Sequence, residues 1–311
     1  MFRQWIIFII FISFSYQAHS IDLTDFGAQV FSQSLNSELV LRDDSDGREV
    51  EITPEAPGFR GLGVSYKGIG ASYQWISRNE EDRNKKSEAS GFKWTVPWGD
   101  FLFEYYNTEF EGADVSGAGF RTDIDSFDQG FIVTWARKKD LDFSSIFGLE
   151  KTLSDGERDY MTHTIFNVSY QESIWRSDTA MIPVSTGPDD FLAFRYMRRR
   201  LTKASIGRTY VKYFDKVRFS GIVSIGPFVG KRLLKYEATS NLTEDEETEW
   251  GLGASIGFSI ASDYGLKRLG KKLGTHFNYG LNLYAHNASS FGEQNISTLQ
   301  TAAGVYFGSL W

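Results

Sequence analysis

Seven charged residues fall at alternating positions of segments that read as β-strands, on the face that we expect to point inward: Arg195, Arg208, Lys212, Arg218, Glu104, Asp128 and Glu150. Three further arginines, Arg198 to Arg200, end the segment that holds Arg195. Facing an enclosed interior, such charges either form a constriction that selects anionic solutes or pair with one another and fill the space. We favour pairing, because an interior too narrow for bulk water must satisfy its charges internally.

The histidines offer no recognisable catalytic group. Beyond the first 20 residues the chain contains His163, His276 and His286. His276 and His286 lie on one expected strand, about 33 Å apart at about 3.3 Å per residue, so they cannot share a site. The spacing of His and carboxylate residues marks no metal site, and the glycines alternate along strands instead of forming a phosphate-binding loop. We therefore predict no catalytic residue, no metal and no cofactor.

The strand pattern that positions these residues is clearest in the last dozen positions, Gln300 to Trp311. Apolar residues at Ala303, Val305, Phe307 and Trp311 alternate with small or polar ones, which is typical of a strand with lipid on one side and a wet interior on the other. The chain also stops on an aromatic residue. We expect Phe307 and Trp311 to act as the assembly signal that the barrel insertion machinery reads.

The same alternation recurs along the chain. Trp250 to Ala261 turns Ile256 and Phe258 to one face and Ser255 and Gly257 to the other, and Thr275 to His286 repeats the pattern. Other expected strands include 141–153, 191–199, 203–214, 217–225 and 228–239, with loops at 78–88, 112–126, 177–190 and 240–249 and tight turns at 67–68, 138–140 and 215–216. An open edge is not tolerated in hydrocarbon. The sequence therefore predicts an all-β, transmembrane, antiparallel up-and-down β-barrel of about 12 strands, within a range of about 10–14.

The first 20 residues have the pattern of a signal peptide. Arg3 precedes the apolar run Trp5 to Phe14, and Ala18-His19-Ser20 suits signal peptidase. The run is too short to span a membrane as a helix. We expect the mature protein to begin at Ile21 and to lie in the outer membrane of a Gram-negative bacterium. Residues 21–56 form a lead-in, a hairpin or a plug, and residues 57–311 form the barrel.

Composition limits the function classes. A net charge of −7 argues against nucleic acid as a partner. The chain has no Cys, so its stability must come from packing and backbone pairing. Aromatic residues make up 16% of the chain, with 30 Gly and 6 Pro, which fits many strands with aromatic girdles and tight turns.

Three segments resemble an uncharacterised family of bacterial outer-membrane β-barrels whose domain has no assigned function. They are Pro57 to Trp75, Asp100 to Phe110 and Phe166 to Ser185. An early pattern of that family is matched by Leu62, Gly63, Tyr66, Lys67 and Gly68. The chain departs from the family at 175–180. The resemblance implies the barrel fold and no particular activity.

These observations support three hypotheses. The first is a structural or binding barrel with a charge-filled lumen, and the second is a narrow, porin-like diffusion channel that prefers anions. The third is an enzyme that modifies outer-membrane lipid. Outer-membrane lipid and the insertion machinery are the expected partners, together with small solutes if the lumen is open.

Overall fold

The computed structural model describes residues 26–44, 47–66, 69–76, 87–136, 160–181, 194–214, 217–237, 242–264, 266–273, 275–292 and 294–310. These residues form thirteen antiparallel strands and one short helix, α3 (Lys267–Leu273). The strands are β1 (Phe26–Asp43), β2 (Arg48–Thr53), β3 (Glu55–Tyr66), β4 (Ile69–Ile76), β5 (Glu88–Trp98), β6 (Phe101–Val115), β7 (Gly119–Ala136), β8 (Tyr160–Arg176), β9 (Phe194–Phe214), β10 (Val217–Glu237), β11 (Leu242–Ser262), β12 (His276–Ser290) and β13 (Gln294–Leu310). The expected all-β barrel and its range of strand number are confirmed.

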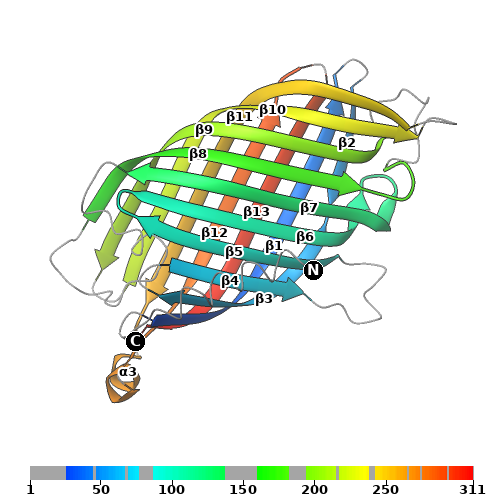
Figure 1. Cartoon of the computed structure of the whole chain (residues 1–311). Coiled ribbons are helices and arrows are strands. Elements are labelled where there is room, and N and C mark those ends of the chain that lie inside the picture. Colours follow the sequence, from blue (N-terminus) through cyan, green and yellow to red (C-terminus); the bar gives the residue numbers. More distant parts are fainter. Residues whose placement is uncertain are drawn as a thin grey trace, which may run out of the picture.

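The sheet closes on itself. β1 pairs with β13 from Gly27↔Leu310 to Asp43↔Gln294, so the first and last strands leave no free edge between them. Figure 1 shows the strands wound on a slant around a tube, with α3 beyond one end. The strands are staggered around the ring. A path that starts at Phe214 of β9 and passes from each residue to its partner on the next strand comes back to β9 at Arg200, fourteen residues away along the strand. This stagger gives a tilt of about 40°, as closure requires.

The two ends of the barrel differ in strand number. We call the end where β1 begins and β13 ends the base, and the opposite end the rim. β2 and β3 lie in one line along β1, with Leu39↔Ile52 and Asn36↔Glu55 in the same register. Pro54 interrupts this line because it has no N–H to donate. At the base the ring therefore consists of twelve strands. Near the rim β2 pairs directly with β6, because β4 and β5 are shorter and do not extend that far.

The barrel wall begins earlier than residue 57. β1, β2 and the start of β3 occupy residues 26–56, which the sequence had left open as a lead-in, a hairpin or a plug. They form a hairpin within the wall. Its outward positions do not look like those of a lipid-facing strand, which is expected to be apolar: Arg42, Glu49 and Glu51 carry charges near the rim, and Ser32 and Ser34 are polar.

Two segments expected as loops are strands. Residues 112–126 contain only a short turn, Ser116 to Ala118; Gly117 within it and Gly119 directly after it adopt positive φ. Residues 242–249 continue β11, paired in register with residues 230–237 of β10. Acidic side chains are accepted there because Lys231 on β10 binds Glu246 at 2.5 Å. Likewise the two segments expected at 191–199 and 203–214 fall, where they are described, on one strand, β9 (194–214), and those expected at 217–225 and 228–239 fall on one strand, β10 (217–237).

Several expectations concern residues that the structure does not describe. They are the signal peptide at 1–20, the strand at 141–153 with Glu150, the three tight turns, most of the loops at 78–88 and 177–190, and Trp311. Within the described part of the chain, no helix has the length and apolar character needed to cross a membrane.

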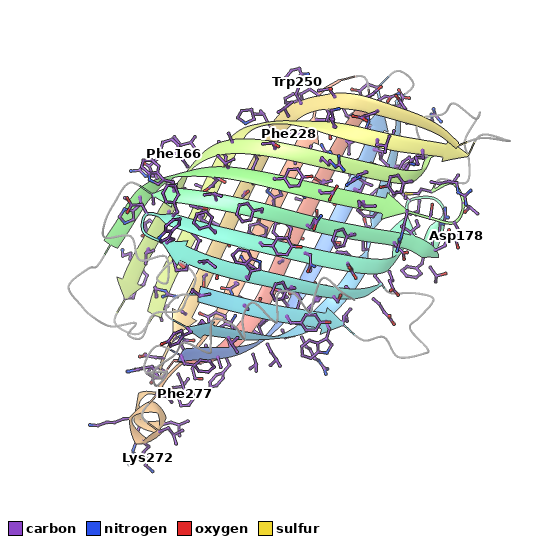
Figure 2. All side chains as sticks on the ribbon, in the orientation of Figure 1. Phe166, Asp178, Phe228, Trp250, Lys272 and Phe277 are labelled. Carbon is purple, nitrogen blue, oxygen red and sulfur yellow. The ribbon has the colours of Figure 1, made fainter. Side chains whose placement is uncertain are left out.

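The predicted facing of β11 is confirmed. Ile256 and Phe258 are each 41% exposed on the outer surface, whereas Gly257 between them is buried. Figure 2 shows Phe166 and Trp250 projecting from the outside of the ribbon. Apolar and aromatic side chains therefore cover the outer wall.

Neighbouring positions on β12 provide a test of this facing. Leu283 points outward and is 43% exposed, whereas Asn282 lines a hollow in the interior. Leu283→Arg is expected to lower the free energy of unfolding by about 2–4 kcal/mol, because it places a charge in lipid near the midplane. Asn282→Arg should cost clearly less, since its side chain enters a polar space. Urea unfolding of both variants in lipid vesicles measures the difference, and equal losses would contradict the assigned facing.

Candidate functional site

The interior near the rim is filled by apolar side chains. Residues from eight strands and the segment after β8 meet there in one buried cluster: Leu39, Leu41, Val50, Ile52, Ala113, Val115, Ile124, Trp175, Met181, Phe194, Met197, Leu234 and Ile296. We call this set the rim core. A water-filled channel is lined by polar residues instead. The rim half of the barrel is therefore packed like the core of a soluble protein.

A buried ion pair lies in the interior close to the rim core. Arg199 Nε donates to Glu249 Oε1 at 2.8 Å, and the two side chains are only 1% and 5% exposed. Further donors of the guanidinium reach the Ile296 carbonyl at 3.2 Å and Thr298 Oγ1 at 3.3 Å. A buried charge is tolerated only when it is paired and hydrogen-bonded in this way.

Contacts also cross the interior between strands that are far apart in the ring. Asp128 on β7 accepts a hydrogen bond from Gln300 on β13, and from Ser173 Oγ (2.9 Å) and Gln171 Nε2 (3.2 Å) on β8. The bonds from Arg199 on β9 to β13 cross in the same manner. Opposite walls that bond directly leave little space for a solute at this level.

A second charge pair lies toward the rim. The buried Arg232 of β10 binds Glu247 of β11, and its Nη1 donates to the Gln294 carbonyl at 3.3 Å. Lower in the barrel, Lys93 Nζ lies 2.7 Å from Glu104 Oε1. Three interior cations, Arg199, Arg232 and Lys93, are thus each paired with a carboxylate on another strand.

The structure divides the residues that the sequence assigned to the lumen. Arg218, Glu104 and Asp128 are buried inside the barrel. Arg208 and Lys212 are on the outer wall instead, where Arg208 Nε donates to Thr162 Oγ1 at 3.2 Å and Lys212 lies over the Phe214 ring. Arg195 is half-buried beside the register shift at the start of β9, and Glu150 lies outside the described residues.

The error on β9 has a physical reason. Its inward face is formed by Leu201, Lys203, Ser205, Thr209 and Val211, all buried. Each face of this strand carries cations, so charge does not reveal which face is inside. Because β9 is a single strand, only the middle of the three consecutive arginines, Arg199, points inward. Strict alternation through an uninterrupted strand is the signal that would have identified it.

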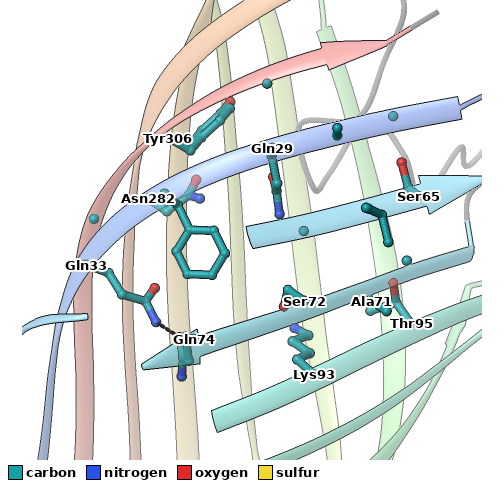
Figure 3. Close-up of a pocket in the computed structure, with 18 of the residues that line it drawn as sticks. Gln29, Gln33, Ser65, Ala71, Ser72, Gln74, Lys93, Thr95, Asn282 and Tyr306 are labelled. Atoms are coloured by element: carbon teal, nitrogen blue, oxygen red, sulfur yellow. Dashed lines mark hydrogen bonds between the residues drawn. The ribbon is translucent and has the colours of Figure 1, made fainter. Parts of the chain in front are cut away.

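Toward the base the interior opens into a hollow of about 330 Å³ on the side of β1, β3, β4, β5, β12 and β13. Its lining is mainly amide, hydroxyl and aromatic, including Gln29, Ser72, Asn282 and Tyr306. Figure 3 shows these side chains and the hydrogen bond between Gln33 and Gln74. A Cβ at Gly63 would lie 2.6 Å from Gln29 Nε2, so a larger residue there would displace the Gln29 side chain from its place in the lining.

A serine and a histidine meet on the inner wall. Ser255 of β11 pairs in register with His286 of β12, and Ser255 Oγ lies 2.8 Å from His286 Nδ1. Lys203 Nζ donates to the same hydroxyl at 3.5 Å. No local motif marks this pair, because its members are 31 residues apart in the sequence and meet only through strand pairing. A nucleophile and a base have this spacing in hydrolases, but here the histidine is buried at 9% exposure and faces the interior, not lipid.

Within the described residues, no group of three or more His, Asp or Glu side chains is placed to hold a metal ion.

Comparison with known proteins found similar folds only. No protein-family model and no curated protein matched the chain. Among solved structures, the outer-membrane protease OmpT of Escherichia coli matches with a TM-score of 0.40 at 7% identity, over 95% of this chain and 99% of that one. The toluene transporter TodX of P. putida gives 0.32 at 9% identity, over 94% and 91%. The β domain of the Bordetella autotransporter BrkA gives 0.32 at 11%, over 91% and 98%. At these values none of them assigns a role to this chain.

The assignment of the fold rests on the geometry of this chain and not on these similarities. The ring of strands is closed, its outer wall is apolar and its interior holds polar and charged side chains. Only closed barrels and helices satisfy every backbone group in hydrocarbon. The protein is a closed β-barrel whose apolar outer wall suits it to span a membrane.

Proposed function

We propose that this barrel serves a structural or binding role in the outer membrane and does not act as an open diffusion channel. The observation that carries the proposal is the set of direct bonds across the interior, from Gln300 to Asp128 and from Arg199 to the β13 backbone. The rim core next to them supports it, because apolar side chains exclude hydrated ions.

The binding part of the proposal concerns the hollow near the base. Its amide and hydroxyl groups suit a small, neutral, polar solute. Lys93 carries a cation into its lining, but that charge is neutralised by Glu104 at 2.7 Å. The hollow therefore offers hydrogen bonds without a net electrostatic preference.

The two other hypotheses find less support. An anion-preferring channel would use Arg208 and Lys212 as lining charges, and both are on the outer wall. An enzyme acting on membrane lipid would need its nucleophile within reach of the bilayer, and Ser255 and His286 face inward.

Conductance in planar lipid bilayers tests the proposal. The purified, folded protein is expected to produce no single-channel steps under conditions in which an established porin does, because the rim core and the cross-interior bonds block the path. Insertion is checked independently by heat-modifiable migration on gels of protein recovered from the bilayer lipid. Regular steps with anion selectivity would overturn the proposal in favour of the channel.

A further inference from the structure

Charged residues form an ordered group on the outer wall just beyond the apolar surface. On three adjacent strands, Tyr170, Thr202 and Val229 are paired in one row. Two residues toward the rim, the next outward-facing row is Glu172, Arg200 and Lys231, again paired in register. The change from uncharged to charged side chains therefore occurs at the same position on β8, β9 and β10, as expected where lipid tails give way to headgroups.

Two arginines in this group share one carboxylate. Glu172 Oε1 accepts hydrogen bonds from Arg198 Nε at 2.6 Å and Arg200 Nε at 3.0 Å. The other oxygen of Glu172 accepts from Gln129 Nε2 at 2.7 Å, and the carboxylate is only 8% exposed. The arginine side chains remain 34% and 44% exposed. One buried negative charge thus fixes two guanidinium groups, which keep a net positive charge on the surface.

We propose that Arg198 and Arg200 bind the phosphate of an anionic lipid headgroup in the rim-side leaflet. A guanidinium presents N–H donors in a planar fork that matches phosphate oxygens, and Glu172 holds both forks in place before the ligand arrives. A lipid fits better than free phosphate because Tyr170 and Val229, which are 42% and 55% exposed, lie one row toward the base, where the acyl chains of a bound lipid would pack. Lys231, bound to Glu246 at 2.5 Å, borders the site.

The same strand supplies a matched control at its other end. Arg208 and Lys212 also face outward from β9, but Arg208 donates to a threonine hydroxyl and Lys212 lies over an aromatic ring. Within the described part of the chain, Arg208 and Lys212 share no carboxylate. If binding were a general attraction between cations and anionic lipid, Arg208 and Lys212 would contribute to it as well. If binding occurs at the proposed site, these two residues do not contribute.

The test uses the full-length folded protein in neutral detergent. Diphosphoryl lipid A is titrated as the probe, with binding followed by native mass spectrometry and by the shift in unfolding temperature. Arg198→Gln with Arg200→Gln is expected to weaken binding at least about tenfold, while Arg208→Gln with Lys212→Gln leaves it unchanged. Fully dephosphorylated lipid A should bind the unmodified protein as weakly as diphosphoryl lipid A binds the first variant.

The remaining arms make each outcome decisive. Arg198→Lys with Arg200→Lys keeps the charge and removes the planar fork, so binding should fall while heat-modifiable folding is retained; this variant decides the matter if the glutamine variant fails to fold. Equal losses in both glutamine pairs would overturn the proposal as non-specific attraction. Equal binding of dephosphorylated lipid, or a full thermal shift with inorganic phosphate alone, would also overturn it.

Discussion

Replacing Arg199 with methionine is expected to lower the free energy of unfolding by about 3–5 kcal/mol. The substitution leaves Glu249 as an uncompensated carboxylate at 5% exposure, and it also removes donors to the β13 backbone and to Thr298. Methionine roughly fills the same volume, so the loss reports the charge and not a cavity. Urea unfolding of the barrel in lipid vesicles, followed by tryptophan fluorescence, measures the effect.

Two further variants separate burial from charge. Lys231→Met breaks the exposed pair with Glu246, whose side chains are 65% and 53% exposed, and should cost at most about 1 kcal/mol. Arg199→Met combined with Glu249→Leu removes both buried charges and should recover much of the loss. Similar losses for Arg199→Met and Lys231→Met would show that the interior is wet and that the filled-lumen description is wrong.

Truncation of the rim core is the second large effect. Trp175 is 3% exposed among apolar side chains of the interior. Trp175→Ala is expected to cost about 3–5 kcal/mol, because the surrounding wall of strands cannot collapse into the cavity left behind. The same urea titration measures it.

A tryptophan on the outer wall provides the comparison. Trp98, at the end of β5, is 75% exposed. Trp98→Ala should cost clearly less than Trp175→Ala, since lipid or detergent fills the vacated space. A small loss at Trp175 would mean that the cluster is not a packed core. The proposal of a closed interior would then lose its support at the rim.

The fold and the candidate site differ in how far they can be predicted. Which face of β11 meets lipid follows from local alternation, because side chains on a strand point to opposite sides every second residue. Ile256 and Phe258 are therefore outside, as the sequence indicates. Closure follows too, since hydrocarbon does not tolerate an unpaired edge.

Local alternation fails where both faces of a strand are polar. On β9 it does not distinguish Arg208 outside from Lys203 inside, and on β1 the small polar residues Ser32 and Ser34 hide a wall strand. The acidic residues of β11 near Glu246 read as a loop, although cross-strand cations accommodate them in a strand. In each case the deciding contact comes from a neighbouring strand.

The sequence by itself therefore determines that the chain closes into a membrane barrel and where its most amphipathic strands face. Only the tertiary structure decides which inward residues meet. The stagger of fourteen residues around the ring brings β7 to β13 at Asp128 and Gln300, and β9 to β13 at Arg199 and Ile296. Side-chain alternation has a period of two residues and carries no information about strands on opposite walls. Closure of the barrel and the stagger of its strands determine which inward residues of opposite strands come into contact.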